Sequence, residues 1–161
     1  MSMIEQLALE LSDKLKRHQW KMVTAESCTG GGLAYFLTNI PGSSEWFDRG
    51  FVTYSNAAKE ELLHVKPLTL NAFGAVSEQT AREMAEGALK HSQAHISIAI
   101  TGIAGPDGGT ADKPVGTVWL AWSSTFNQTH TEVDIFSGNR QEIREQTILT
   151  AIKKLLAFMP S

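Results

Sequence analysis

The chain has 161 residues, of which 42% are hydrophobic and 19% are charged, and its formal net charge is −3 at pH 7. This length and composition are typical of one globular domain with a single core, so we expect residues 1–161 to form one domain. A weakly acidic chain has no general electrostatic attraction to nucleic acid or to anionic lipid, which argues against both as partners.

The cysteine content and the N-terminus indicate the compartment. The single cysteine, Cys28, excludes an intramolecular disulfide and fits a reducing environment. The segment from Met1 to Leu11 contains Glu5 and Glu10 and lacks the apolar run of a secretory signal. No stretch approaches the roughly 18–20 apolar residues of a membrane span. We therefore predict a soluble, cytoplasmic protein.

The first half of the chain alternates between predicted helices and strands. Helices are indicated by apolar residues at helical spacing, and strands by short aromatic or β-branched runs. In chain order we predict a helix over 4–15, a strand over 21–25, a short helix over 33–37, a strand over 47–54, and a helix that Ser55 or Asn56 caps and that continues through Lys59 and Leu62.

The second half ends on two neighbouring strands. In chain order we predict a helix that Ser77 caps and that carries Ala81, Met84, Ala85 and Ala88 on one face, a buried strand over 96–100, two strands over 115–122 and 131–136 that can pair, and a last helix that begins with a capping box at Asn139 and Glu142. This order predicts a single α/β domain, a three-layer α/β/α sandwich with a mixed sheet.

Two glycine-rich loops follow predicted strands. Residues 26–32 read Glu-Ser-Cys-Thr-Gly-Gly-Gly, and residues 101–109 read Thr-Gly-Ile-Ala-Gly-Pro-Asp-Gly-Gly. Ligands of open α/β sheets bind at the C-terminal ends of strands, so we expect both loops to share one site. Neither loop is a Walker A motif, because no Gly-Lys-Ser/Thr follows, and neither matches the dinucleotide fingerprint closely.

The first loop carries three potential nucleophiles in a row, Ser27, Cys28 and Thr29. The N–H groups and partial positive charge of a helix start can bind phosphate or stabilise an oxyanion. The alternative is a plain helix cap, which serine and threonine supply routinely. The second loop can form an anion-binding concavity from its backbone N–H groups, or it is a long surface turn.

Two basic residues follow predicted strand ends. Lys59 lies just past the strand over 47–54, and a lysine whose pKa is lowered by its surroundings can act as a base toward serine. Arg140 opens the last helix, where a cation is unfavourable unless an anion is near, which hints at a phosphate or carboxylate ligand. The alternatives are a solvated surface lysine and an ordinary exposed arginine.

The histidines do not indicate a metal site. His91 and His95 have the i, i+4 spacing of a zinc-binding helix, but no glutamate follows His91, and His95 lies at the start of the predicted strand over 96–100. We predict neither a metal nor any other cofactor. Spacing does not rule out a Ser-His-Asp triad, because triads form in space, but Gly-x-Ser-x-Gly is absent. The remaining histidines are His18, His64 and His130.

Several motifs of the chain, in the same order, closely resemble the CinA C-terminal domain family. They are Thr-Ala-Glu-Ser-Cys-Thr-Gly-Gly at 24–31, Gly-Ser-Ser at 42–44, Gly-Phe-Val-Thr-Tyr-Ser-Asn at 50–56, Gly-Ala-Val-Ser at 74–77, the loop at 101–109, and Lys-Pro-Val-Gly-Thr-Val-Trp at 113–119. The motifs span almost the whole chain, which makes the resemblance far more specific than one glycine loop. One small departure is Thr101, where serine is the more common residue.

The resemblance implies a three-layer α/β/α fold, a homodimer, no metal, and an amidohydrolase that converts nicotinamide mononucleotide to nicotinic acid mononucleotide and ammonia, a salvage step of NAD recycling. It implies Ser27 as the nucleophile, Lys59 as its base and Tyr54 as a third member of the site. Many members of the family carry an additional N-terminal domain, and we expect this chain to be the stand-alone version.

The residues expected to bind the substrate come from the two loops and the adjacent helix starts. They are Cys28, Thr29, Gly30, Gly31, Asn56, Thr101, Gly102, Ala104, Gly105, Gly108, Gly109 and Arg140. The main alternative is a non-catalytic module that binds pyridine nucleotides in competence or the response to DNA damage, but such a module needs no pairing of Ser27 with Lys59. A phosphatase is disfavoured, because no cluster of carboxylates accompanies the loops.

Overall fold

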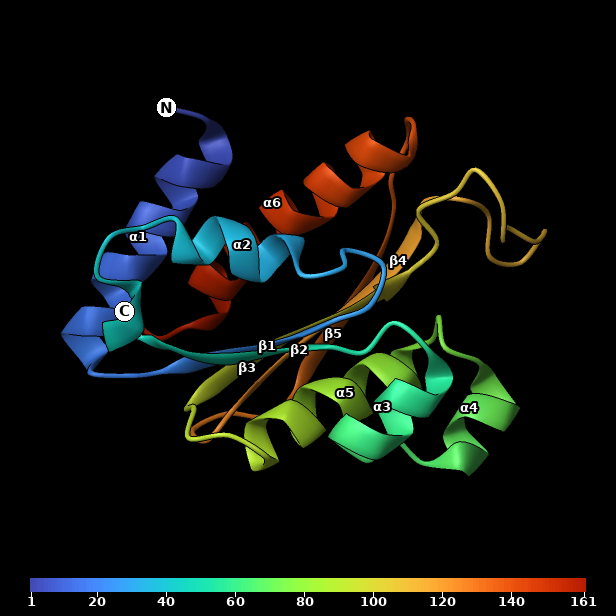
Figure 1. The fold of residues 1–161 in the computed structure, drawn as a ribbon, viewed down its shortest axis with the longest axis horizontal. Helices are drawn as coiled ribbons and strands as arrows, with labels where there is room; N and C mark the ends of the chain where they lie inside the picture. Colours follow the sequence, from blue (N-terminus) through green and yellow to red (C-terminus); the bar gives the residue numbers. More distant parts are fainter.

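Five strands form one mixed sheet in the computed structural model, which describes residues 1–161 (Figure 1). The strands are β1 (Met22–Glu26), β2 (Phe47–Val52), β3 (Ile96–Gly102), β4 (Thr117–Ser124) and β5 (His130–Ile135). Their order in the sheet is β2-β1-β3-β4-β5. β1 pairs in parallel with β2 and β3, and β4 pairs antiparallel with β3 and β5. The predicted mixed sheet and the pairing of its last two strands are confirmed, and that pairing is antiparallel.

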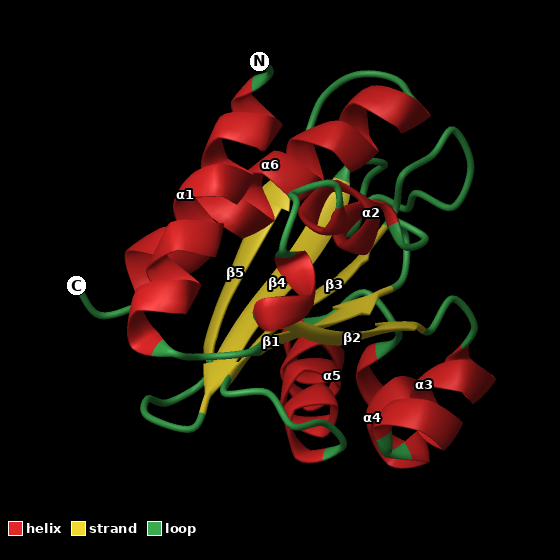
Figure 2. Ribbon diagram, turned by 60° about the vertical axis from the view of Figure 1, so that its left-hand side comes forward, coloured by secondary structure: helices red, strands yellow, loops and turns green.

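Helices cover both faces of this sheet, as the sequence predicted (Figures 1 and 2). One face is covered by α1 (Met3–His18), α2 (Gly32–Thr38) and α6 (Arg140–Phe158), and the other by α3 (Asn56–Leu63), α4 (Pro67–Phe73) and α5 (Glu78–Lys90). The three-layer α/β/α architecture is therefore confirmed. No helix has both the length and the apolar character needed to cross a bilayer.

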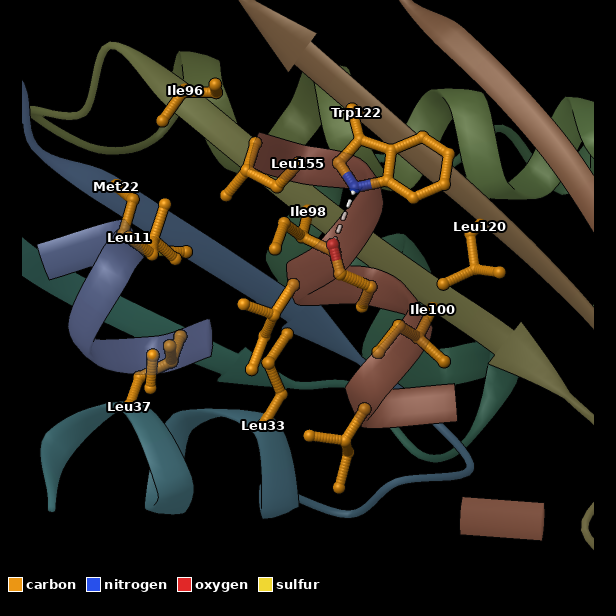
Figure 3. Packing of buried hydrophobic residues seen from close by; sticks show 14 of the residues in the cluster. Leu11, Met22, Leu33, Leu37, Ile96, Ile98, Ile100, Leu120, Trp122 and Leu155 are labelled. Atoms are coloured by element: carbon orange, nitrogen blue, oxygen red, sulfur yellow. Dashed lines mark hydrogen bonds between the residues drawn. The ribbon is translucent and has the colours of Figure 1, made fainter. Parts of the chain in front are cut away.

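The two faces of the sheet have different cores. Large side chains fill the side of α1, α2 and α6, where the indole N–H of Trp122 donates to the carbonyl of Ala151 at 3.1 Å (Figure 3). On the other side, small residues of the sheet such as Ala99 and Ala121 face the alanine-rich side of α5. Small residues on both surfaces allow the helix to lie close to the strands.

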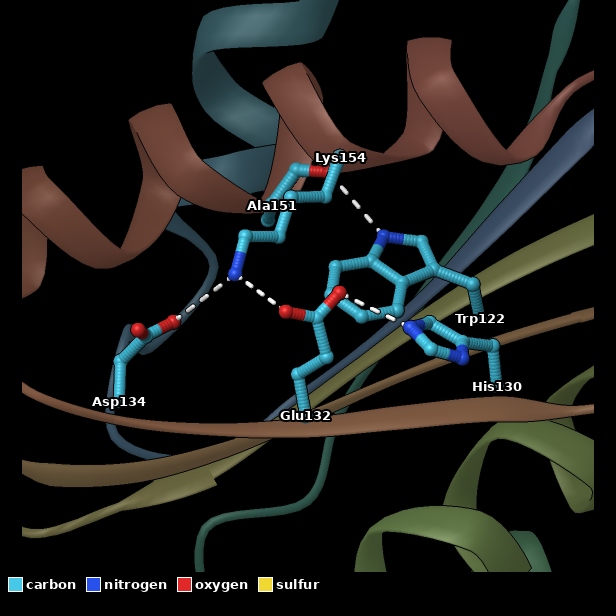
Figure 4. Close-up of polar contacts among 6 residues, drawn as sticks. All are labelled: Trp122, His130, Glu132, Asp134, Ala151 and Lys154. Carbon is cyan, nitrogen blue, oxygen red and sulfur yellow. Dashed lines mark hydrogen bonds and ion pairs between the residues drawn. The ribbon is translucent and has the colours of Figure 1, made fainter.

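Ion pairs tie the edge strand β5 to α6 (Figure 4). Lys154 on the helix contacts Glu132 and Asp134 on the strand, and Glu132 also bonds to His130 at 2.9 Å. The bond to Lys154 is the largest cause that lowers the pKa of the Glu132 carboxyl. About a third of each side chain is exposed, so each pair contributes at most ~1 kcal/mol. The pairs hold the edge strand in place against the helix.

The helix starts agree closely with the sequence, and one helix was missed. Ser55 and Ser77 are N-caps, and Asn139 and Glu142 form a capping box. The sequence did not predict α4, because a helix of seven residues that begins at Pro67 is too short to show a clear apolar period. The strand predicted over 115–122 begins two residues later, because the preceding Gly116 adopts a φ of 97°.

The backbone of α5 approaches α3 closely at Gly87. A Cβ atom at this position would overlap with the carbonyl oxygen of Leu63, the last residue of α3. The missing side chain therefore sets how close α3 lies to α5. Because α3 also carries Lys59, this contact contributes to the position of that lysine.

We predict that Gly87→Ala destabilises the protein by roughly 1–3 kcal/mol, the usual cost of overpacking. An alanine within an unconstrained helix would instead gain up to about 1 kcal/mol relative to glycine. Urea unfolding monitored by circular dichroism measures the difference. Lys90→Ala, at an exposed position of the same helix, is the control and should stay within about 0.5 kcal/mol of the parent protein. A Gly87→Ala protein as stable as the parent would contradict the close approach.

Candidate active site

A cavity of about 280 Å³ lies at the C-terminal ends of β1 and β3, and both glycine-rich loops line it. Its walls also include the segment after β2, the turn before α5 and the start of α6. The lining residues are Ser27, Cys28, Tyr54, Asn56, Lys59, Ala75, Val76, Thr101, Gly102, Ile103, Ala104, Gly105, Asp107, Gly108 and Arg140. Loops that are far apart in the sequence thus meet at one edge of the sheet.

The amine of Lys59 contacts the hydroxyl of Ser27 inside this cavity. The Nζ–Oγ distance is 2.9 Å, and Nζ also donates to the carbonyls of Thr53 at 2.9 Å and Tyr54 at 3.2 Å. Lys59 is in the first turn of α3, and helical side chains point back toward the N-terminus, which directs the amine to the end of β2. The side chain is only 1% exposed.

Burial lowers the pKa of Lys59 from 10.5 to about 8. A neutral amine has two N–H donors and one lone pair, and its three partners here are two carbonyls and a hydroxyl. The two carbonyls accept hydrogen bonds from the two N–H groups, which leaves the lone pair of Nζ facing the hydroxyl of Ser27. The same contacts therefore serve the charged amine as a donor and the neutral amine as a proton acceptor.

Ser27 stands where β1 turns into the first loop. Its N–H donates to the carbonyl of Ile100 at 3.0 Å, which continues the pairing of β1 with β3 by one residue. Its own carbonyl accepts from the N–H of Gly30 at 3.0 Å, and this turn depends on a φ of 60° that favours glycine. The N–H groups of Cys28 and Thr29 have no acceptor in the protein. They are available to a negatively charged oxygen near Ser27.

Glu26, the last residue of β1, anchors the loop from the interior of the protein. Its fully buried carboxylate accepts from the Thr29 hydroxyl, from the N–H of Leu33 at 2.9 Å and from the N–H of Ala34 at 3.0 Å. The two N–H donors belong to the first turn of α2, where a negative charge is favourable. This role of Glu26 was not predicted from the sequence, although an acidic residue directly before a predicted loop and helix start is a local signal for it.

The thiol of Cys28 lines the cavity beside Ser27 but is poorly suited to attack a carbonyl. Burial raises its pKa to about 11, so the thiol is protonated at neutral pH. The thiolate is the nucleophilic form of cysteine. Of the three potential nucleophiles in the loop, Thr29 is fully buried with its hydroxyl on Glu26, and only Ser27 has its oxygen beside a basic group.

The second loop offers backbone donors to the cavity. The N–H groups of Ala104, Gly105, Asp107 and Gly108 have no acceptor in the protein. Successive free N–H groups of this kind form anion-binding concavities. The hydroxyl of Thr101 points elsewhere and donates to the carbonyl of Ala75 at 2.8 Å, which fixes the opposite wall.

Arg140 joins the second loop to the segment after β2. Its guanidinium donates to the carbonyl of Gly105 at 2.7 Å and to the hydroxyl of Tyr54 at 2.9 Å. The side chain of Tyr54 is therefore at the rim of the cavity, 57% exposed, while its backbone carbonyl contacts Lys59 inside. An arginine at this helix start is accommodated by a carbonyl and a hydroxyl, and it retains further donors for an anion.

Not every residue predicted for the site lines the cavity. The predicted residues that do not line it are Thr29, Gly30, Gly31 and Gly109. No histidine lines the cavity, and the structure has no group of three or more metal-ligating side chains that could hold an ion. Sequence analysis missed other residues that line or brace the site, and these are Glu26, Ala75, Val76, Ile103, Asp107 and Arg144.

Comparison with known proteins places the chain in a family. The family model of the CinA C-terminal domain matches residues 4–159. The nicotinamide-nucleotide amidohydrolase PncC of Enterobacter agglomerans is 48% identical over 95% of this chain and 93% of its own length, and PncC of Escherichia coli K12 is 47% identical over 96% and 93%. The crystal structure of competence/damage inducible protein CihA from Agrobacterium tumefaciens matches with a TM-score of 0.95 and 47% identity, covering 98% of this chain and 96% of that one. The chain therefore belongs to the CinA C-terminal domain family.

Proposed function

We propose that the protein hydrolyses the carboxamide of nicotinamide mononucleotide to nicotinic acid mononucleotide and ammonia, a salvage step of NAD recycling. The observation that carries this proposal is the 2.9 Å contact between the buried Lys59 amine and the Ser27 hydroxyl. The names of the similar amidohydrolases support the substrate. A module that only binds nucleotides has no use for a buried lysine whose pKa is lowered toward neutrality.

The first half of the reaction forms an acyl-enzyme. Neutral Lys59 takes the proton of Ser27 as Oγ attacks the carboxamide carbon, which the cationic pyridinium ring makes more electrophilic than that of a plain amide. The N–H groups of Cys28 and Thr29, or those of the second loop, stabilise the oxyanion of the tetrahedral intermediate. Lys59 then gives its proton to the leaving nitrogen, which departs as ammonia.

The second half returns the enzyme to its starting state. A water molecule attacks the ester carbon and transfers a proton to Lys59, and a second tetrahedral intermediate forms at the same carbon. Its collapse breaks the bond to Ser27, and Lys59 returns the proton to Oγ. Nicotinic acid mononucleotide leaves with a carboxylate in place of the carboxamide. One lysine thus acts as base and acid in both halves.

The phosphate of the substrate requires an anion site at the other end of the cavity. The free N–H groups from Ala104 to Gly108 and the guanidinium of Arg140 supply donors there, and a guanidinium binds phosphate with strong charge-assisted bonds. Asn56, at the start of α3, adds an amide to the lining. The homodimer that the family resemblance implies and the cytoplasmic location that the sequence indicates stay predictions.

We predict that Ser27→Ala lowers kcat by roughly 10³-fold or more, because the nucleophile is lost, while the fold is retained. Ammonia release from nicotinamide mononucleotide measures the loss. Ser44→Ala, at an exposed serine outside the cavity, is the matched control. The nucleophile would be misassigned if Ser27→Ala kept near-normal activity while Cys28→Ala did not.

We predict that Lys59→Ala lowers the rate of acylation by roughly 100-fold, the usual scale for a general base. Lys59→Arg should not restore it, because arginine keeps its charge and cannot accept a proton. In the parent enzyme the rate should rise as the pH increases through about 8, since only the neutral amine is a base. Single-turnover ammonia release across this range measures both effects.

The exposed Lys153 offers a matched control for this experiment, because Lys153→Ala removes a lysine from the surface of α6. Its rate and pH profile should match those of the parent enzyme. Substantial rescue by Lys59→Arg would show that Lys59 supplies only positive charge. That result would end its assignment as a base but leave the amidohydrolase function standing.

We predict that ammonia release proceeds at an unchanged rate after dialysis against EDTA, because Ser27 and Lys59 supply the nucleophile and the base. The measurement compares dialysed enzyme with and without added divalent ions. A loss of activity that one metal restores would contradict a reaction carried by these side chains alone.

A further inference from the structure

Two arginines one turn apart on α6 contact the two glycine-rich loops of the site. Arg140 donates to Gly105 in the second loop at 2.7 Å, and Arg144 donates to the carbonyl of Thr29 in the first loop at 3.1 Å. Residues four apart lie on the same face of a helix, so α6 directs both side chains toward the cavity edge of the sheet. The start of α6 thus bridges two loops, at 26–32 and 101–109, that are distant in the sequence.

The carbonyl that Arg144 contacts is at the centre of the nucleophile loop. Thr29 O also accepts from the N–H of Gly32 at 2.9 Å, so both lone pairs of this oxygen are occupied. The turn that contains it begins at Ser27, whose carbonyl accepts from the N–H of Gly30. This carbonyl belongs to the peptide group of Thr29 and Gly30, which directly follows the group that presents the free N–H of Thr29. Fixing the carbonyl therefore restrains the turn that carries the free N–H groups beside Ser27.

Arg144 makes few other contacts that would explain its position. Its guanidinium forms no ion pair, its single hydrogen bond is the one to Thr29, and its Nε is buried without a partner. A half-buried cation with one hydrogen bond is a poor stabilising element, because its desolvation is not fully compensated. The position of Arg144 is better explained by its hydrogen bond to the first loop, which holds the Thr29 carbonyl.

The charge of Arg144 also reaches the place where negative charge develops. Its positive charge is one of the influences that lower the pKa of the Cys28 thiol, against the larger effect of burial. Cys28 follows Ser27 directly, so an oxyanion at the carbon attacked by Ser27 lies in the same field. A preorganised cation near such an oxygen favours the transition state over the ground state.

We infer that Arg144 is a positioning residue of the site, which holds the Thr29 carbonyl so that the N–H groups of Cys28 and Thr29 remain turned to the oxyanion. This inference rests on the proposed amidohydrolase function. The two arginines then have different roles. Arg140 contacts the second loop and the rim of the cavity, and Arg144 contacts the nucleophile loop. Because Arg144 does not line the cavity, its loss should affect turnover rather than substrate binding.

Arg144→Met tests the inference, because methionine retains much of the apolar stem and removes the hydrogen bond and the charge. We expect kcat to fall about 10- to 100-fold, as for a displacement of reacting groups by about 1 Å, while KM changes less than about threefold. The amides of Gly30 and Gly32, which close the turn, should exchange their hydrogens about tenfold faster in NMR measurements on the ligand-free protein.

Arg82→Met is the matched control, because Arg82 on α5 also contacts one backbone carbonyl, that of Thr129, and lies outside the cavity. It should leave kcat, KM and the exchange of the loop amides unchanged. If circular dichroism shows that Arg144→Met is unfolded, kcat and KM are measured for Arg144→Lys instead. Lysine retains the positive charge on a shorter side chain, and the same fall in kcat with little change in KM is expected.

Three results would overturn the inference. The first is a kcat of the Arg144 variant within twofold of the parent enzyme. The second is a raised KM at unchanged kcat, which would make Arg144 a substrate-binding group. The third is unchanged exchange at Gly30 and Gly32. Absence of ammonia release by the parent enzyme would instead overturn the proposed function, and the exchange measurement would still decide whether Arg144 holds the loop.

Discussion

The site is organised around one buried amine. Lys59 must be desolvated for its pKa to approach neutrality, yet a desolvated amine must also find partners for its polar hydrogens. Ser27 and the carbonyls of Thr53 and Tyr54 meet both demands, and they come from the ends of two neighbouring parallel strands. The N–H of Thr53 donates to the carbonyl of Glu26 at 2.8 Å, so the ends of β1 and β2 remain in register up to the serine. The pairing of the sheet thereby sets the geometry between Ser27 and Lys59.

This arrangement lowers the stability of the fold. The amine titrates at about 8 in the folded protein, against 10.5 for an unperturbed lysine, so protonation favours the unfolded chain. Above about pH 10.5 the amine is neutral in both states and the effect vanishes, and below about pH 8 it is fully present, at roughly 3 kcal/mol. The large apolar side chains between the sheet and α1, α2 and α6 offset it. Small residues between the sheet and α5 allow α3 and its lysine to lie close to the strand ends, but they bury less apolar surface than large side chains would.

Periodicity and caps were enough to predict the layers, because each long element carries its own pattern. Ser55, Ser77 and the pair Asn139–Glu142 marked three helix starts correctly, and alternating strands and helices indicated two covered faces. The pairing of Ser27 with Lys59 came from the family resemblance, since no local pattern distinguishes a buried lysine from a solvated one. The anchoring role of Glu26 had one local signal, an acidic residue directly before a loop and a helix start. The contact of Arg144 had none, because it depends on how a distant helix packs against the first loop.

Both loops of the site are rich in glycine, and this explains why charged side chains from elsewhere hold them. Glycine allows the φ of 60° at Gly30 and of 78° at Gly105, but it has no side chain to pack, so apart from Cys28 and Ala104, which reach the core, these loops have few apolar contacts of their own. The backbone must instead be fixed through its N–H and C=O groups. Glu26 holds the first loop from the interior, while Arg140 and Arg144 hold the carbonyls of the two loops from α6. Carboxylates accept from N–H groups and guanidinium groups donate to carbonyls, so opposite charges secure opposite ends of the peptide groups. The N–H groups that remain unpaired are then those of Cys28, Thr29 and the second loop, beside the cavity.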